Sequence, residues 1–178
     1  MGTSRDKGRV FVTVGTTLFD ALVKEVDSQE CKQVLASHGY SSLLIQLGRG
    51  SFLPTKSDGE DGSLKVDYFT FAPNLADYIS SSALVISHAG SGSIFETLRA
   101  KKPLVVVVND LLMDNHQCEL AEELADKKYL LCASPSSLVH VLRSMDLQSL
   151  VPYPPSTPFA LVNTLDAFLG FSQSYSST

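Results

Sequence analysis

Hydrophobic positions along the chain follow two patterns. Short runs of apolar and β-branched residues predict buried strands, and segments whose apolar residues recur every three or four positions predict amphipathic helices. The predicted strands cover 9–14, 42–47, 64–71, 84–87, 104–108 and 129–132. The predicted helices cover 19–35, 74–82, 91–100, 115–127, 138–145 and 159–171. Ser136 and Ser137 stand where a cap for the helix at 138–145 is expected.

This order of elements predicts the fold class. Strands alternate with helices, and all strands but one are apolar on both faces, which is typical of an α/β protein with a doubly wound, mostly parallel, Rossmann-like sheet. We expect one domain over 9–170, with flexible polar tails at 1–8 and 172–178. The composition of 54–62 predicts a mobile surface loop. In such a sheet the ligand is expected at the carboxyl ends of the strands.

The most informative segment is 84–97, where an apolar run ends in a turn rich in glycine and serine and a helix follows. Such a corner aims backbone N–H groups and the positive end of the helix dipole at an anion. Gly90 and Gly92 let the backbone approach a ligand closely. Glu96 falls in the first turns of the helix, where a carboxylate can reach a ribose. The same residues also fit an ordinary strand-to-helix turn.

Two further loops carry polar chemistry. Residues 15–17, Gly-Thr-Thr, follow the first strand, and residues 109–117 follow the strand at 104–108. The second loop is rich in amide, carboxylate and imidazole groups, which suit sugar hydroxyls; Asp114 or Asn115 also fits the role of a cap for the next helix.

The glycine pattern weakens two other nucleotide-binding explanations. A dinucleotide fingerprint needs a third glycine where Phe95 stands, and the first turn holds a single glycine. A nicotinamide-dependent enzyme is therefore disfavoured. No Gly-x-x-x-x-Gly-Lys-Ser/Thr sequence occurs, which excludes a P-loop.

Composition narrows the setting of the protein. The 178 residues carry a net charge of −5, which argues against broad nucleic-acid binding. Cys31, Cys118 and Cys132 are odd in number and widely spaced, as reduced thiols in a cytosolic compartment would be. The polar N-terminus predicts no secretory signal, and Asp6 stands where a myristoylation site needs Ser or Thr. The apolar run 103–108 is too short to span a bilayer.

Several motifs in the same order support a resemblance to a known family. They are Val-Thr-Val-Gly-Thr-Thr at 12–17, Gln-Leu-Gly-Arg-Gly at 46–50, the run 86–96, Lys-Pro-Leu-Val at 102–105 and Asn-His-Gln at 115–117. Over about 10–169 the chain resembles the donor-binding half of GT-B glycosyltransferases. Within that superfamily it is most similar to the catalytic subunits of eukaryotic two-component UDP-N-acetylglucosamine transferases of dolichol-linked oligosaccharide synthesis. The bacterial relative that the resemblance points to is the lipid-intermediate transferase of peptidoglycan assembly, which holds both halves on one chain.

The resemblance implies an activity and a set of donor contacts. The activity is inverting transfer of N-acetylglucosamine from UDP-GlcNAc to GlcNAc-diphospho-dolichol in protein N-glycosylation. Residues that contact the donor phosphates would be Gly15, Thr16, Thr17, Gly90, Ser91, Gly92 and Ser93. Glu96 would bind the ribose, and Asn115, His116 and Gln117 the sugar. His88 would either touch the uridine or phosphate side or hold the turn. Arg49 is a candidate for donor or interface contact, although a lone arginine in such a loop also fits a solvated role.

The resemblance also implies partners. No Asp-x-Asp metal pair occurs, so we expect no cofactor and no metal, with backbone N–H groups and a helix dipole stabilising the leaving group. None of His38, His88, His116 and His140 is placed as an obvious base. The base and the lipid acceptor site are therefore expected on a membrane-anchored subunit, which would recruit this cytoplasmic chain to the cytosolic face of the endoplasmic reticulum.

The helix at 159–169 is the candidate element for docking on that subunit. Its apolar face consists of Phe159, Val162, Leu165, Phe168 and Leu169. The same face fits packing on the chain's own sheet equally well. A non-catalytic nucleotide-sugar-binding module of the same fold remains the alternative function.

Overall fold

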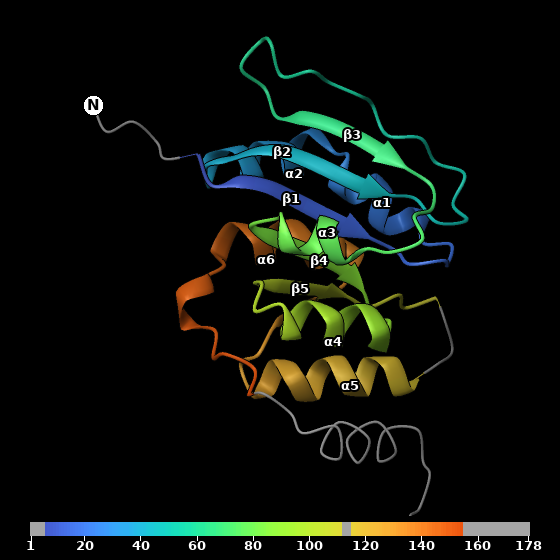
Figure 1. The fold of residues 1–178 in the computed structure, drawn as a ribbon, viewed down its shortest axis with the longest axis vertical. Helices are drawn as coiled ribbons and strands as arrows, with labels where there is room; N and C mark the ends of the chain where they lie inside the picture. Colours follow the sequence, from blue (N-terminus) through green and yellow to red (C-terminus); the bar gives the residue numbers. More distant parts are fainter. Residues whose placement is uncertain (1–5, 112–114, 155–178) are drawn as a thin grey trace, which may run out of the picture.

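Six parallel strands form one sheet in the computed structural model, which describes residues 6–111 and 115–154 (Figure 1). The strands are β1 (Gly8–Thr13), β2 (Tyr40–Gln46), β3 (Lys65–Phe69), β4 (Leu84–His88), β5 (Leu104–Val107) and β6 (Leu131–Ala133). They lie in the order β3-β2-β1-β4-β5-β6, and every pairing is parallel. The α/β class and the parallel sheet predicted from the alternation of patterns are confirmed.

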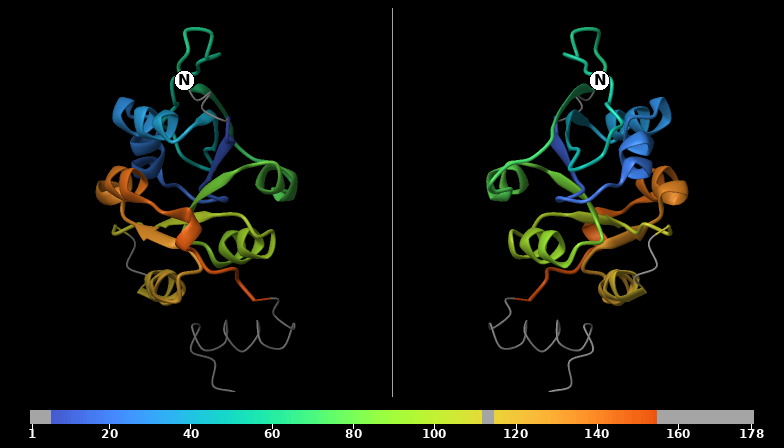
Figure 2. Two further views of the ribbon diagram at one scale, coloured as in Figure 1. Left: turned by 90° about the vertical axis from the view of Figure 1, so that its left-hand side faces the viewer. Right: turned by 90° about the vertical axis from the view of Figure 1, so that its right-hand side faces the viewer.

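Helices cover both faces of this sheet (Figure 2). They are α1 (Asp20–Val26), α2 (Gln29–Ser37), α3 (Ala76–Ser80), α4 (Ser91–Arg99), α5 (Asn115–Asp126) and α6 (Leu138–Ser144). Short 3₁₀ turns occupy Pro135–Ser137 and Leu147–Ser149. One face carries α1, α2 and α6, and the other carries α3 and α4, with the buried side chains of α5 joining the second core.

The strand β1 shows why the central strands read as continuous apolar runs. Val10 and Val12 pack into the core beneath α1, α2 and α6, whereas Phe11 packs into the core beneath α3 and α4. All three are fully buried. Successive side chains of a strand point to opposite faces, so a strand covered by helices on both sides needs apolar residues at every position.

The strand order reverses direction between β1 and β4, and this reversal places the candidate site. The chain moves from β1 outward to β2 and β3, and from β4 outward in the opposite sense to β5 and β6. The loop after β1 leads to α1 on one face, and the loop after β4 leads to α4 on the other. The carboxyl ends of two neighbouring strands therefore open a crevice, which is where doubly wound folds bind ligands.

The predicted single helix at 19–35 is wrong, because the chain forms two helices there. α1 ends at Val26, and Ser28 caps α2 by accepting a hydrogen bond from the Cys31 N–H at 3.1 Å. Serine at this position satisfies an N–H group that the helix leaves unpaired, so a second helix begins directly after the first ends. The apolar spacing continues across the break and hides it from a reading of periodicity.

The start of α6 differs from the prediction in its hydrogen bonding. Ser137 does not cap α6 through its side chain; instead, Ser134 and Ser137 form the reciprocal capping box of the 3₁₀ turn that precedes α6. Ser137 thus stands at the N-cap of α6, as predicted, but its side chain makes no capping hydrogen bond to that helix. The helix predicted at 159–171 lies outside the described residues.

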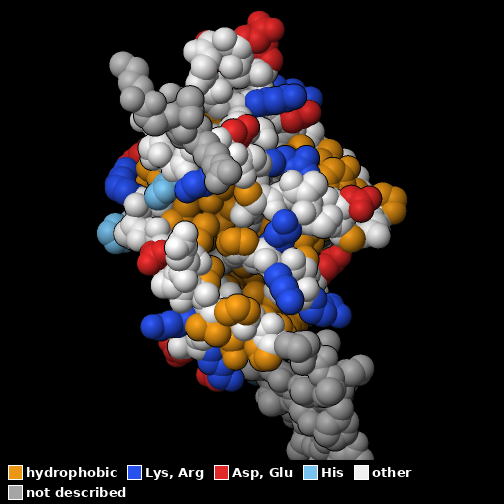
Figure 3. All heavy atoms as spheres, turned by 60° about the vertical axis from the view of Figure 1, so that its left-hand side comes forward, with side chains coloured by type: hydrophobic (Ala, Val, Ile, Leu, Met, Phe, Trp, Pro, Cys, Tyr) orange, Lys and Arg blue, Asp and Glu red, His pale blue; other side chains and the backbone are white. Residues whose placement is uncertain are grey.

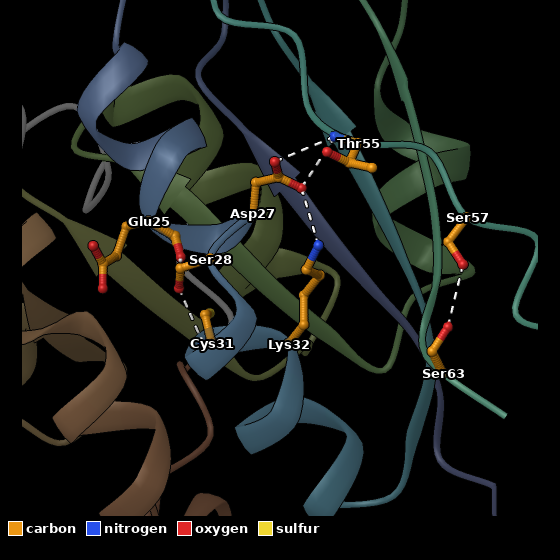
Figure 4. A network of polar contacts seen from close by, with 8 residues as sticks. All are labelled: Glu25, Asp27, Ser28, Cys31, Lys32, Thr55, Ser57 and Ser63. Atoms are coloured by element: carbon orange, nitrogen blue, oxygen red, sulfur yellow. Dashed lines mark hydrogen bonds and ion pairs between the residues drawn. The ribbon is translucent and has the colours of Figure 1, made fainter. Parts of the chain in front are cut away.

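The segment 54–62, predicted as a mobile loop, is connected to neighbouring elements by hydrogen bonds. Asp27, which follows α1, accepts hydrogen bonds from the Thr55 N–H at 3.2 Å (Figure 4). The same carboxylate forms an ion pair with Nζ of Lys32 at 3.3 Å. An antiparallel bridge joins Ser57 to Val66 at the edge of the sheet. These contacts hold the loop against α1, α2 and β3.

The face shown in Figure 3 carries an apolar patch with Lys and Arg side chains around it. A pocket of about 480 Å³ lies between Tyr40, Ala83, Met145 and Leu147, with Lys7 and His38 at its margin. None of the predicted site residues lines it. Within the described part of the chain, none of the helices has both the length and the apolar character that a membrane span requires.

Candidate functional site

The two glycine-containing corners predicted to bind phosphate lie side by side. β1 and β4 are neighbours in the sheet, and Thr13 at the end of β1 is in register with Ser87 of β4. The first corner, 15–17, continues from β1, and the second, 90–93, continues from β4. The ring of His88 lies between the corners. A Cβ added at residue 15 would lie 2.8 Å from its Cε1 atom, and one at residue 90 would lie 2.3 Å from its Nε2 atom.

The first corner presents one unpaired backbone donor. The Gly15 N–H donates to Oγ1 of Thr13 at 3.0 Å, and the Thr17 N–H donates to the Val14 carbonyl at 3.2 Å. The Thr16 N–H has no hydrogen-bond acceptor within the described residues, and Thr16 is exposed. Gly15 has a φ of +62°, a left-handed conformation that glycine adopts without strain.

The second corner presents the N-terminus of α4. Gly90 is extended and precedes the helix, and among the described residues no side chain caps it. Ile94 is the first residue of α4 whose N–H bonds back, to the Gly90 carbonyl at 3.0 Å. The N–H groups of Ser91, Gly92 and Ser93 therefore have no partner within the helix. Together with the Thr16 N–H, they form a set of donors suited to an anion with several oxygens.

His88 is a neutral group between these donors. Its Nδ1 atom is buried and has no hydrogen-bond partner among the described residues. Burial lowers the pKa of His88 below its usual 6.5, because a charged imidazolium is costly where water is excluded. A neutral imidazole carries one N–H donor and one acceptor nitrogen. The ring fills the space between Gly15 and Gly90 and carries one donor and one acceptor nitrogen at this point.

A layer of buried polar side chains supports the crevice from below, and the sequence reasoning missed it. Thr13, Gln46 and Ser87 are all buried, at the ends of β1, β2 and β4. Oγ1 of Thr13 donates to Oε1 of Gln46 while it accepts the Gly15 N–H. Oγ of Ser87 donates to the His88 carbonyl at 2.8 Å. The available signal was a polar residue at the end of an apolar strand.

The remaining predicted residues lie on elements that begin at the same edge of the sheet. Glu96 is half-buried in the second turn of α4. His116 and Gln117 are exposed in the first turn of α5, which Asn115 begins, and Nδ1 of His116 lies 3.9 Å from the Glu119 carboxylate. Because α5 follows β5, the neighbour of β4, its N-terminus also starts at this edge.

Arg49 lies beside the first corner rather than apart from it. Its side chain is exposed, and its backbone N–H donates to the Thr17 carbonyl at 3.0 Å. Two larger pockets, of about 540 and 640 Å³, lie between α2 and the 57–65 segment. None of the predicted site residues lines either pocket, so these two pockets are separate from the candidate site.

Comparison with known families gives a match over nearly the whole chain. Residues 9–167 match the model described as the glycosyltransferase family 28 C-terminal domain. The UDP-N-acetylglucosamine transferase subunit ALG13 of Saccharomyces cerevisiae is 35% identical over 201 residues, which cover 93% of this chain and 99% of that protein. The mouse protein of the same name is 45% identical over 142 residues, covering 75% of this chain. The chain spans only 12% of the mouse protein's length.

Solved structures agree with these sequence matches. The NMR solution structure of ALG13 has a TM-score of 0.68 and 32% identity, over 90% of this chain and 96% of that one. The crystal structure of MurG from Acinetobacter baumannii has a TM-score of 0.58 and 20% identity, over 90% of this chain but 49% of that one. The second likeness shows that the fold recurs as about half of a longer chain.

Proposed function

This chain belongs to the family of UDP-N-acetylglucosamine transferase subunits ALG13, within the glycosyltransferase family 28 C-terminal domains, and from that premise we propose its activity. It binds UDP-GlcNAc at the carboxyl edge of its sheet. It contributes the donor half of a transferase that moves N-acetylglucosamine onto GlcNAc-diphospho-dolichol. The observation that carries this proposal is the meeting of the two corners around His88.

The donor diphosphate lies across the two corners in this proposal. The N–H of Thr16 and those of Ser91, Gly92 and Ser93 have no partner among the described residues and would donate to the phosphate oxygens, and the dipole of α4 adds positive potential there. Gly15, Thr17 and Gly90 shape the backbone around the phosphates. A pyrophosphate has several oxygens within a few ångströms of one another, so two adjacent corners bind it better than one.

The rest of the donor extends along elements that start at the same edge. Glu96 accepts hydrogen bonds from the ribose hydroxyls, since it follows the phosphate-facing turn of α4. Asn115, His116 and Gln117 bind the sugar from the start of α5. His88 holds the two corners in place and offers its polar edge to the phosphates, and Arg49 adds positive charge beside the first corner.

Catalysis in this proposal rests on charge. Cleavage of the bond between the sugar and UDP builds negative charge on the β-phosphate, and the free N–H groups stabilise it more in the transition state than in the ground state. Removal of one such oriented donor typically costs about 10²–10³ in rate. Attack by the acceptor hydroxyl also needs a general base. The second half of the transferase supplies that base together with the lipid acceptor.

The second half is a separate, membrane-anchored subunit in this proposal. The relatives in yeast and mouse are both named as subunits. The chain covers about half of the longer MurG chain, which supports the view that a second half completes the cleft around the donor. Docking on that subunit places this chain at the cytosolic face of the endoplasmic reticulum; the candidate docking helix at 159–169 lies outside the described residues.

Titration of the ¹⁵N-labelled full chain with UDP tests the donor site. We expect the amide resonances of Thr16, Ser91, Gly92 and Ser93 to shift together, with one dissociation constant. A titration to millimolar UDP without shifts at these amides contradicts the site. Addition of a membrane fraction holding the acceptor subunit should then start transfer of GlcNAc to a GlcNAc-diphospho-lipid. Binding without any transfer in that mixture favours a non-catalytic module.

A further inference from the structure

The loop after β2 is held against the corner after β1 by the carboxylate of Asp20. Oδ2 of Asp20 accepts hydrogen bonds from the N–H of Ser51 at 3.2 Å and from its Oγ at 3.1 Å. Oδ1 accepts the Phe52 N–H at 3.4 Å. Asp20 is half-buried and is the first residue of α1, so it closes the segment that begins at Gly15. One side chain thus ties two strand-to-helix connections together.

A second tie lies nearer the corner itself. The Arg49 N–H donates to the Thr17 carbonyl at 3.0 Å. Gly48 lies so close that a Cβ on it would stand 2.4 Å from the same carbonyl oxygen. The segment from Thr17 to Asp20 is therefore held at both of its ends by residues 48–52.

Gly50 has no side chain, and the Asp20 carboxylate occupies the space where one would lie. A Cβ added at residue 50 would lie 2.2 Å from Oδ1 of Asp20, closer than real Cβ contacts. The backbone of Gly50 does not have a left-handed φ, so the contact with Asp20 is the main obstacle to a larger residue there. Gly50 and Asp20 therefore act as one unit.

We propose that Asp20 is a positioning residue, which fixes the corner 15–17 so that the Thr16 N–H points into the diphosphate crevice. The inference rests on the proposed function, since it assigns that crevice to UDP. An unanchored corner would have to be ordered when the ligand binds, and that ordering costs conformational entropy. A carboxylate that accepts several N–H and O–H groups makes charge-assisted hydrogen bonds, and by ordering the corner in the free chain it removes part of this cost in advance.

The sign of the effect separates this role from simple electrostatics. A negative charge beside an anion site repels the anion, so electrostatics alone predicts tighter UDP binding when Asp20 is neutralised. The positioning role predicts weaker binding. Asp20→Asn keeps the size of the side chain but replaces one acceptor oxygen with an amide donor, which cannot accept an N–H.

Asp27→Asn is the matched control. Asp27 also anchors the loop after β2, through the Thr55 N–H, but it stands at the far end of α1. Both variants remove one negative charge and weaken one tie of the same loop. We expect Asp20→Asn to weaken UDP binding by about tenfold, the scale of a lost hydrogen bond to a charged group, and Asp27→Asn to leave it unchanged. Equal or tighter binding by Asp20→Asn overturns the inference, as does an equal loss in both variants.

Gly50→Ala supplies a second, independent variant. Its Cβ should displace Asp20 and weaken UDP binding in the wild-type background, but add nothing in an Asp20→Ala background. Coupling of this kind is what a double-mutant cycle measures. Additive losses contradict the view that the two residues act as one unit.

A readout without UDP keeps this inference distinct from the proposed function. Amide ¹⁵N relaxation of the free chain should show greater motion at Gly15, Thr16 and Thr17 in Asp20→Asn than in Asp27→Asn or wild type. An unchanged corner overturns the positioning role, whether or not UDP binds. A wild-type chain that binds no UDP contradicts the proposed function instead.

Discussion

Nε2 of His88 lies 2.3 Å from the position that a Cβ on Gly90 would take. The imidazole of the last residue of β4 thus folds back over the turn that follows it, and the turn is open to it because residue 90 has no side chain. The same ring also fills the space beside Gly15, so it packs between the second corner and the first. A larger residue at position 90 must move the ring.

We therefore predict that Gly90→Ala destabilises the chain by about 1–3 kcal/mol, the usual cost of overpacking. Gly92→Ala is the control: it is two residues further on, in α4, and nothing lies within 4 Å of its added Cβ. Alanine there should leave stability equal or slightly higher, because it favours helix over glycine. Urea denaturation measures both, and a Gly90→Ala variant as stable as Gly92→Ala contradicts the contact.

The close approach of the loop after β2 predicts a second difference between glycines. Gly48 and Gly62 both have a left-handed φ, of +58° and +82°, so alanine is strained at both positions. Only at residue 48 would the Cβ also meet the Thr17 carbonyl, at 2.4 Å, whereas it meets nothing within 4 Å at residue 62. We expect Gly48→Ala to cost about 1–3 kcal/mol more than Gly62→Ala. Equal midpoints of urea unfolding would show that the two loops do not need this contact.

Burial of His88 predicts a dependence of stability on pH. Its pKa is lowered in the folded chain, so below about pH 6.5 the unfolded chain binds a proton that the folded chain does not. The free energy of unfolding should therefore fall as the pH drops from 6.5 through the lowered pKa. His88→Gln should flatten that slope, and the exposed His140→Gln should leave it as in wild type. If all three proteins show the same slope, titratable groups other than His88 cause the pH dependence of stability.

The proposed ribose contact predicts a loss specific to the sugar hydroxyls. Glu96→Gln should weaken UDP binding by about tenfold, as expected when a hydrogen bond to a charged acceptor is lost. It should affect 2′-deoxy-UDP less, because one hydroxyl that the carboxylate binds is already missing. Glu123→Gln, on the outer face of α5, is a control that breaks only the ion pair with Lys127. Calorimetric titration with both nucleotides checks the prediction, and an equal loss for the two ligands contradicts a ribose contact.

The pattern of apolar runs was sufficient to predict the class of the fold and the position of every strand within a few residues. A strand buried on both faces must be apolar throughout, and this local requirement is visible in 84–86 and 104–108 without any knowledge of the partners. The break between α1 and α2 was missed because a serine cap ends one helix and starts another without disturbing the apolar spacing.

The sequence by itself determined that glycine-containing corners follow the strands β1 and β4, because turn and strand signals are local. Only the tertiary structure decided that the two corners are neighbours, since the strand order depends on long-range pairing. It also decided which side chains support them: the Thr13–Gln46 hydrogen bond and the Asp20–Ser51 tie join residues about thirty positions apart. Such contacts form between side chains whose separation in sequence leaves no periodic signal, so they become visible only when the sheet brings the loops together.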